Sequence, residues 1–296
     1  MTKLKRILLT GSAGQLGQSI KTIAAGYHNY EFVFANRQQL NLSNETSIDD
    51  FFKDQTFDII INCAAYTSVD KAETEPELAS QINHLAVQRL ADIAKQHTAK
   101  LIHVSTDYVF SGKQYRPYVE TDEATPHGVY GKTKLYGEQA IQQTLKTNAV
   151  IIRTSWVYSE YGNNFVKTLL KLGQERNSLN VVSDQVGTPT YAKDLAKGIM
   201  SIVQSQIFNQ IDFETNIVHY SNEGVCSWYD FTKAIFEITD IQCQVSPIET
   251  KDYPTPAKRP HYSVLNKAKI KQKYFLTIPY WKDSLKQCLA ALKDRT

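Results

Sequence analysis

Short, continuously apolar runs recur along the first half of the chain and alternate with longer amphipathic segments. The runs lie at residues 6–10, 31–35, 58–62, 101–105 and 149–155. Strands without polar alternation are typical of parallel sheets that are buried on both faces. The segments between them carry apolar residues at helical spacing, most clearly from Pro76 to Lys95. This alternation predicts an α/β protein with a doubly wound parallel sheet.

The pattern changes after about residue 155, where loops lengthen and turn-forming residues increase. Helical patterns at about 191–205, 227–238 and 281–292 are separated by short strand-like pieces. We predict a sheet domain at residues 1–155 and a smaller lobe, mainly for substrate, at residues 156–296. The chain is expected to return to the sheet near 190–205. Ligands of such folds lie at the carboxyl ends of the strands, here between the two lobes.

Composition and charge narrow the class of protein. The net charge of the 296 residues is only +3 and the basic residues are scattered, so nucleic acid is not an expected partner. The four cysteines form no C-x-x-C pair and indicate free thiols in a reducing compartment. No run of 18 apolar residues occurs, so we expect a cytoplasmic protein without a membrane span. The histidines lack ligand spacing, and no metal site is predicted.

A glycine-rich loop, "GSAGQLG", joins the first strand to the first helix. In this position, three spaced glycines are typical of dinucleotide binding. Gly11 permits a tight turn, Gly14 lets the backbone approach a pyrophosphate, and Gly17 allows the helix to pack close to the strand. The helix N-terminus offers free N–H groups and a positive dipole end to phosphates. An ordinary strand–helix turn is the alternative.

The second strand ends in Asn36 and Arg37, at the position where an NAD site carries an acid for the ribose 2′-OH. A guanidinium suits a 2′-phosphate instead. The sequence therefore favours NADPH as the cofactor, with NADH as the alternative. An exposed arginine that binds no ligand is the competing interpretation.

Tyr130 and Lys134 are four residues apart in "YGKTK", so their side chains share one face of a helix. A cation beside a phenol favours the phenolate. We therefore expect Lys134 to lower the pKa of Tyr130 toward the range of an acid–base catalyst. An ordinary surface pair is the alternative, but a nucleotide site upstream that can supply a hydride favours catalysis.

The order of these motifs, G-x-x-G-x-x-G and then Tyr-x-x-x-Lys, resembles the extended short-chain dehydrogenase/reductase superfamily. Within it, the chain resembles the dTDP-4-dehydrorhamnose reductase family. The matching stretches span nearly the whole chain and include "NCAAYTSVDKAE", "VSTDYVFSG", "VYGKTKLYGE", "SDQVGTPTYAKDLA" and "RPHYSVLN". The resemblance implies a Rossmann-like fold and the NADPH-dependent reduction of dTDP-4-dehydro-6-deoxy-L-mannose to dTDP-L-rhamnose, the last step in the synthesis of that nucleotide sugar.

The resemblance also implies roles for individual residues. Tyr130 would donate a proton to O4, Lys134 would assist it and bind the nicotinamide ribose, and Thr106 would hydrogen-bond the same carbonyl oxygen. Further cofactor contacts are implied for Gly11, Gly14, Gln15, Leu16, Gly17, Asn36, Arg37, Ala64, Ala65, Tyr66 and Thr67. Further substrate contacts are implied for Val69, Asp107, Tyr108, Trp156, Asn164, Lys167, Gln185 and Thr188. Trp156 would form a wall for the deoxysugar ring.

Several alternatives stay open at this point. Val69 can serve simple packing, Asp107 can hold its own loop, and Lys167 can be a solvated helix charge. For the whole protein, the rivals are a non-catalytic, NADP-binding regulatory subunit and a nucleotide-sugar epimerase or dehydratase. A homodimer is compatible with the sequence but is not required by it.

Overall fold

The computed structural model describes residues 4–295, which are built around a six-stranded sheet in the order β10-β5-β4-β3-β1-β2. Every neighbouring pair of strands in it is parallel. The strands are β1 (Lys5–Thr10), β2 (Tyr30–Ala35), β3 (Ile59–Asn62), β4 (Lys100–Thr106), β5 (Ala149–Thr154) and β10 (Asn216–His219). The predicted doubly wound parallel sheet is confirmed, and β10 extends it on the side of β5.

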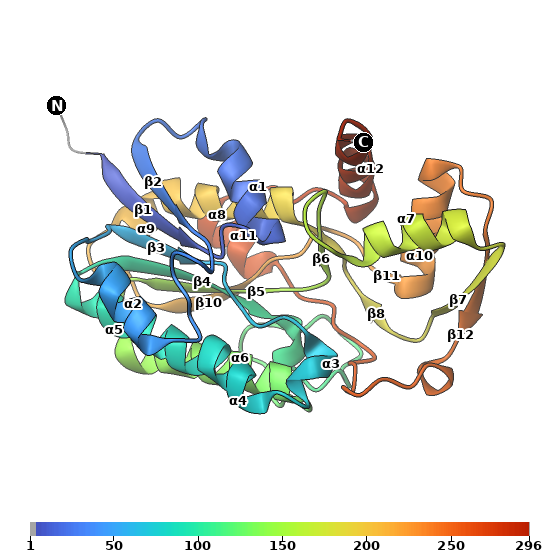
Figure 1. Ribbon diagram of the computed structural model, residues 1–296, viewed down its shortest axis with the longest axis horizontal. Helices are drawn as coiled ribbons and strands as arrows, with labels where there is room; N and C mark the ends of the chain where they lie inside the picture. Colours follow the sequence, from blue (N-terminus) through green and yellow to red (C-terminus); the bar gives the residue numbers. More distant parts are fainter. Residues whose placement is uncertain (1–3, 296) are drawn as a thin grey trace.

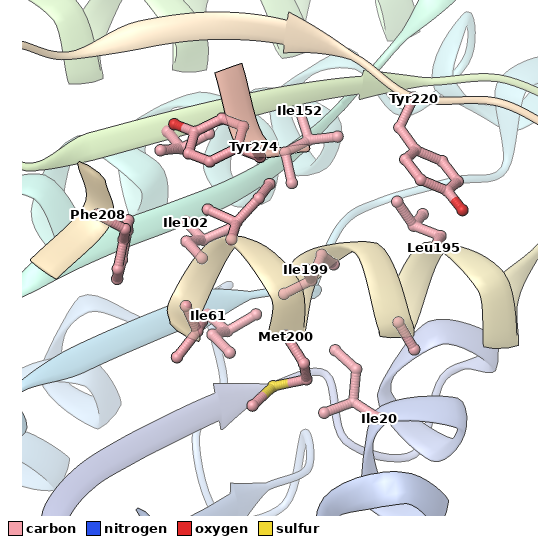
Figure 2. Packing of buried hydrophobic residues seen from close by; sticks show 14 of the residues in the cluster. Ile20, Ile61, Ile102, Ile152, Leu195, Ile199, Met200, Phe208, Tyr220 and Tyr274 are labelled. Atoms are coloured by element: carbon pink, nitrogen blue, oxygen red, sulfur yellow. The ribbon is translucent and has the colours of Figure 1, made fainter. Parts of the chain in front are cut away.

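One face of the sheet is covered by α1 (Gln15–Ala24), α8 (Ala192–Gln204) and α11 (Ala268–Tyr274) (Figure 1). Figure 2 shows Ile61, Ile102 and other strand residues packed beside the apolar side chains of α8. The other face is covered by α2 (Glu45–Phe52), α5 (Ala86–Gln96) and α6 (Val129–Thr144). Burial on both faces explains why the strands are continuously apolar.

The helix predicted from Pro76 to Lys95 is present but contains a wider turn. It consists of α4 (Pro76–Ser80), one π-helical turn (Gln81–Leu85) and α5. Within the π turn, Asn83 accepts a hydrogen bond from the Tyr66 N–H at 2.9 Å and donates one to the Tyr66 carbonyl at 3.0 Å. Single π turns are frequent at functional sites, and this one fastens the loop that follows β3.

The second lobe has its own apolar cluster, formed largely by α7 (Phe165–Glu175), α10 (Trp228–Thr239) and α12 (Trp281–Lys293). The strands β7 (Ser178–Val182) and β12 (Gln244–Ile248) form a parallel pair there. Two-residue strands complete the lobe: β6 (Val157–Tyr158) pairs with β9 (Thr190–Tyr191), and β8 (Val186–Gly187) with β11 (Cys226–Ser227). The short elements are α3 (Val69–Ala72), α9 (Gln206–Asn209) and two 3₁₀ turns (Asp107–Val109 and Thr250–Asp252).

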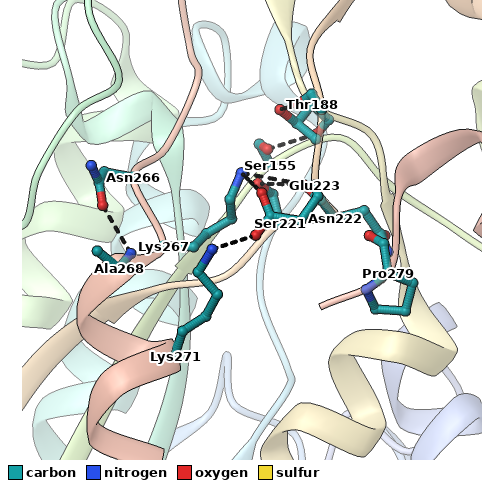
Figure 3. Close-up of polar contacts among 11 residues, drawn as sticks. Ser155, Thr188, Ser221, Asn222, Glu223, Asn266, Lys267, Ala268, Lys271 and Pro279 are labelled. Carbon is teal, nitrogen blue, oxygen red and sulfur yellow. Dashed lines mark hydrogen bonds and ion pairs between the residues drawn. The ribbon is translucent and has the colours of Figure 1, made fainter. Parts of the chain in front are cut away.

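Buried polar contacts join the two lobes. Asn222, which follows β10, donates to Asp194 of α8 and to Ser284 of α12, both at 2.9 Å. Figure 3 shows Asn222 beside Glu223, whose carboxylate pairs with Lys267 at 3.4 Å. These contacts tie α12 to the helix that covers the sheet. Among residues 4–295, no helix has both the length and the apolar character needed to cross a membrane.

Candidate active site

The glycine loop has the close packing that its sequence predicts. Gly11 has a φ of +65°, a conformation that favours glycine. A Cβ on Gly11 would lie 2.7 Å from the Ala64 nitrogen, and one on Gly17 would lie 2.3 Å from the Gly11 oxygen. Gly14 precedes α1 without a side-chain cap, and the first turn of α1 holds no acidic residue. This backbone, with uncapped N–H groups at the start of a ten-residue helix, fits a dinucleotide phosphate.

The end of β2 lies against the glycine loop, because the Ser12 N–H donates to the Ala35 carbonyl at 3.1 Å. Asn36 uses its side-chain oxygen to accept from the Gln38 N–H at 2.9 Å, so it shapes this turn. Arg37 is exposed. The only basic side chain of the turn is therefore accessible beside the glycine loop.

The loop after β3 forms the other wall of the glycine loop, since Ala64 contacts Gly11. Ala64 and Ala65 are half-buried and Thr67 is exposed. Tyr66 donates its hydroxyl to Glu75 at 2.6 Å. The Tyr66 phenol is thus held by a carboxylate at the start of α4.

Gln15 and Leu16 face the protein rather than the open side of the loop. Leu16 is buried in the core, and the Gln15 side-chain oxygen accepts from Ser159 at 3.1 Å and from Asn164 at 2.9 Å. Asn164 also caps α7 by accepting from the Lys167 N–H at 3.2 Å. These contacts use both ends of its amide within the protein, and its implied role as a substrate ligand stays a prediction.

Thr106, Asp107, Tyr108 and Tyr130 meet at the carboxyl end of β4. Gly131 makes this possible, because a Cβ there would lie 2.3 Å from the Tyr108 carbonyl oxygen. The rings of Tyr108 and Tyr130 pack edge to face with centroids 5.4 Å apart. The Thr106 hydroxyl donates to Asp107 at 3.0 Å and also interacts with the Tyr130 hydroxyl. The site thus contains three groups that contact one another in order: the phenol of Tyr130, the hydroxyl of Thr106 and the carboxyl of Asp107.

The charge states in the site differ from the sequence-based expectation. Burial raises the pKa of Tyr130 above its usual value, although the hydrogen bond with Thr106 opposes this. The predicted lowering by Lys134 is wrong: Lys134 Nζ donates to the Val104 carbonyl at 2.6 Å and lies 3.2 Å from His103 Nε2. Burial lowers the pKa of Lys134 to about 8. Tyr130 therefore keeps its proton at neutral pH, as a proton donor must.

Asp107 is a buried carboxyl group at the same position. Burial raises its pKa to about 7, although hydrogen bonds with Thr106 and Ser263 oppose the shift. One carboxyl oxygen, Oδ2, is buried without a hydrogen-bond partner among the described residues. Asp107 therefore both orients the Thr106 hydroxyl and retains hydrogen-bonding capacity at the site.

Beneath the site, Ser105 points to the opposite face of β4, as strand alternation predicts. It donates to Glu138 of α6 at 2.5 Å, and Glu138 forms an ion pair with Arg153 of β5 at 2.6 Å. Both charged side chains are almost fully buried, at 0% exposure for Glu138 and 4% for Arg153. This pair fixes α6, which carries Tyr130 and Lys134, onto the sheet.

Comparison with known proteins places the chain. The family described as RmlD substrate binding domain matches residues 5–294. The dTDP-4-dehydrorhamnose reductase of Aggregatibacter actinomycetemcomitans is 42% identical, over 97% of this chain and 99% of that protein. The chain belongs to the dTDP-4-dehydrorhamnose reductase family.

Solved structures of dTDP-4-dehydrorhamnose reductases agree. The one from Clostridium acetobutylicum has a TM-score of 0.91 and 39% identity, covering 97% of this chain and 99% of its own. The one from Bacillus anthracis, in complex with NADP, has a TM-score of 0.91 and 35% identity, covering 98% and 100%. A UDP-glucose 4-epimerase from Thermus thermophilus, with 17% identity and a TM-score of 0.81, shares the fold.

In this member of the dTDP-4-dehydrorhamnose reductase family, Trp156 is held in an unusual conformation. Its φ is +47°, and its indole stacks on Trp228 with centroids 3.5 Å apart and planes 9° apart. A Cβ on Gly187 would lie 2.7 Å from the Trp156 ring, so Gly187 makes room for it. Trp228 was not predicted from the sequence to lie in the site. It belongs to the stretch "GVCSWYDF", which also resembles the family, and this was the signal that could have identified it.

Two polar residues of the second lobe, Thr188 and Gln185, are buried. Thr188 is fully buried and donates its hydroxyl to the Gly224 carbonyl at 2.8 Å (Figure 3 shows its place beside Ser155). Its hydroxyl is thus used within the protein, and its implied substrate contact stays a prediction. Gln185 is also buried, and its amide donates to Thr250 at 3.1 Å. Both residues shape the chain around β8.

Arg259 reaches the site from the distant loop before α11 and was not singled out by sequence reasoning. Its guanidinium pairs with Asp70 at 2.6 Å and lies 3.4 Å from the Tyr108 hydroxyl. Val69, next to Asp70, is half-buried at the start of α3, and Lys167 is half-buried on α7. In the sequence, Arg259 was signalled by its place at the start of the family-like stretch "RPHYSVLN". It adds a cation beside the tyrosine pair.

Proposed function

We propose that this protein uses NADPH to reduce the 4-keto group of dTDP-4-dehydro-6-deoxy-L-mannose, giving dTDP-L-rhamnose. The observation that carries the proposal is the meeting of Thr106 with Tyr130, on the helix that bears Lys134, at the end of β4. Membership in a family of dTDP-4-dehydrorhamnose reductases supports the same reaction.

An assay of the purified chain with the 4-keto sugar nucleotide and NADPH tests the proposal. We expect loss of NADPH absorbance and equimolar formation of dTDP-L-rhamnose, identified by chromatography against a standard. A non-catalytic subunit would bind NADPH without consuming it. An epimerase would change the sugar without net consumption of NADPH. Either result would reject the reductase.

In the proposed reaction, bound NADPH supplies the hydride to C4. Tyr130 donates its proton to O4, because burial keeps the phenol protonated at neutral pH. Thr106 holds the Tyr130 hydroxyl through their hydrogen bond, and Asp107 accepts from Thr106 at 3.0 Å and so fixes its orientation. Lys134, held under the site by the Val104 carbonyl, is proposed to bind the nicotinamide ribose in its protonated form.

The positions of the other residues support proposed contacts with the cofactor and with the sugar nucleotide. We assign the sheet domain, residues 1–155 with the return through α8, to NADPH, through the glycine loop, Ala64, Ala65 and Arg37. We assign the lobe within residues 156–296 mainly to the sugar nucleotide, with Trp156 as the wall for the deoxysugar. Val69, Tyr108, Lys167 and the newly found Arg259 are proposed to contact the same substrate. The cation of Arg259 suits its anionic diphosphate.

We also propose that the protein acts in the cytoplasm, since all four cysteines are free and three of them are buried. A homodimer is proposed as its assembly. Sedimentation at several protein concentrations would test this, and a single species of 33.6 kDa would reject it.

Replacing Arg37 by alanine should erode the preference for NADPH over NADH. The loss of a charge-assisted hydrogen bond to the 2′-phosphate corresponds to about 1.5–3 kcal/mol, or roughly 10- to 150-fold in the ratio of kcat/KM values. The exposed neighbour Gln38 provides the control, since Gln38→Ala should leave the ratio unchanged. Equal kcat/KM values for the two cofactors in the wild type would contradict the assignment.

Replacing Trp156 by alanine should impair use of the sugar nucleotide and spare NADPH affinity. The indole stacks on Trp228 and lies close to Gly187, and its removal is expected to leave the sugar loosely held for hydride transfer. We expect kcat/KM for the sugar nucleotide to fall by about 1.5–3 kcal/mol, the scale of a lost aromatic contact. Trp156→Phe, which keeps a ring on Trp228, should retain more activity. Normal turnover in Trp156→Ala would place the substrate elsewhere.

A further inference from the structure

A row of buried polar side chains crosses three strands beneath the proposed active site. It runs from Lys134 of α6 through His103 of β4 and Asn62 of β3 to Thr10 of β1, and none of the four is more than 1% exposed. The contacts along it measure 3.2 Å from Lys134 Nζ to His103 Nε2, 3.0 Å from His103 Nδ1 to Asn62 Nδ2, and 2.6 Å from Thr10 to Asn62 Oδ1. The reaction described above makes no use of His103.

A backbone N–H sets the direction of these hydrogen bonds. The Ala64 N–H, which can only donate, lies 3.2 Å from Asn62 Oδ1. The oxygen of the Asn62 amide therefore faces Ala64, and its NH₂ group faces His103. Flipping the amide would bring its NH₂ against the Ala64 N–H, with two donors in contact.

The Asn62 amide in turn selects the tautomer of His103. Because Asn62 Nδ2 donates, His103 Nδ1 must accept and carries no proton. A neutral imidazole then carries its proton on Nε2, which points at Lys134 Nζ. An ammonium at Lys134 would set a second donor against this N–H at 3.2 Å, whereas an amine offers a lone pair to accept it.

We propose that His103 is a positioning residue for Lys134, donating its Nε2–H to the lysine nitrogen and so favouring the neutral amine of Lys134 over its ammonium. The proton that Lys134 needs for its role beside Tyr130 is then bound weakly. When Lys134 takes up a proton, it loses the hydrogen bond from His103. The proton leaves Lys134 as the pH rises through the mildly alkaline range.

The charged and titratable groups around this pair are compatible with that state. Burial is the largest influence and lowers the pKa of Lys134 to about 8, against the opposing influence of Glu138 and Cys63. Glu138 lies on the same helix but is neutralised by Arg153 at 2.6 Å. Burial lowers the pKa of His103 well below its usual value, and Lys134 lowers it further whenever the lysine carries a proton. His103 is therefore neutral, as its contact with Asn62 requires.

The state of His103 can be read directly by nitrogen NMR of the full chain labelled with ¹⁵N-histidine, without cofactor. We expect the long-range proton–nitrogen pattern of a neutral ring with Nε2 protonated and Nδ1 bare, unchanged from about pH 6 to 9 because the pKa of His103 lies well below this range. The ring signal of His103 is identified among those of the seven histidines because it disappears in His103→Gln or shifts in Lys134→Met. A ring protonated on Nδ1, or on both nitrogens, overturns the proposal.

A pH profile of kcat/KM provides the second readout and rests on the reductase activity proposed above. In His103→Gln, the side-chain oxygen can accept from a Lys134 ammonium. The alkaline limb should then move upward by about one pH unit or more, since an acceptor replaces a donor. Ile102→Val, a core change on the same strand, should leave the limb in place. If folded His103→Gln keeps the alkaline limb of kcat/KM at the wild-type pH, the proposal about His103 is overturned. If the wild type is inactive but shows the expected NMR pattern, only the reductase assignment is overturned.

Discussion

Replacing Tyr130 by phenylalanine should lower kcat by roughly 10²–10⁴-fold, the usual contribution of general acid catalysis. The substitution keeps the ring, so its edge-to-face packing with Tyr108 at 5.4 Å should persist. It removes the hydroxyl of the proposed proton donor. Burial keeps this hydroxyl protonated at neutral pH. Steady-state rates with the 4-keto sugar nucleotide measure the effect. NADPH affinity, measured by fluorescence titration, should barely change.

Tyr136 offers a matched control for this experiment. It lies on the same helix, is 46% exposed and has no place in the proposed chemistry, so Tyr136→Phe should keep wild-type kcat. A Tyr130→Phe enzyme that retains more than about a third of the wild-type kcat would remove Tyr130 from the mechanism, because a lost proton donor costs far more.

Replacing Glu138 by glutamine should destabilise the fold by about 3–5 kcal/mol, the range for breaking a buried ion pair from one side. The change leaves the Arg153 guanidinium, 4% exposed, without its counter-charge. Arg153 Nη1 already lacks a hydrogen-bond partner among the described residues, so no other group replaces the carboxylate. For a chain of this length we expect the Tm in a thermal scan to fall by roughly 5–8 °C.

Two further variants test whether the fall in Tm of Glu138→Gln arises from the burial of the ion pair or from the loss of a charge alone. Glu175→Gln removes the carboxylate of an exposed pair, with Lys171 at 3.9 Å, and should leave the Tm unchanged. The double change Glu138→Leu with Arg153→Met removes both buried charges and should recover most of the lost stability. If Glu138→Gln melts like the wild type, the pair does not hold α6 on the sheet.

Local pattern was sufficient for the parts of the fold that depend on neighbouring residues. The buried strands are mainly apolar because helices cover both faces of the sheet, and this is visible in a single run such as the three isoleucines that begin β3 (Ile59–Asn62). The glycine loop and the Tyr130–Lys134 pair are equally local, since fixed spacing within one turn or one helix places their groups. The family resemblance rested on such contiguous motifs and was confirmed by comparison.

Contacts between distant segments were outside the reach of the sequence. Spacing on α6 predicts that Lys134 faces Tyr130, but the tertiary structure turns the Lys134 nitrogen toward His103 and the Val104 carbonyl. The stacking of Trp156 on Trp228 also joins segments far apart in the chain.

The sequence by itself thus determined the sheet, the glycine loop, the helix of Tyr130 and Lys134, and the family, because each depends on periodicity or on spacing within one element. Only the tertiary structure decided which polar groups remain available for chemistry. Thr188 is buried against Gly224 and Asn164 is used as a cap, whereas Arg259 arrives beside Tyr108 from a distant loop. Hydrogen-bonding capacity is consumed by whichever partner packing brings close, and that partner is set by the folded chain as a whole.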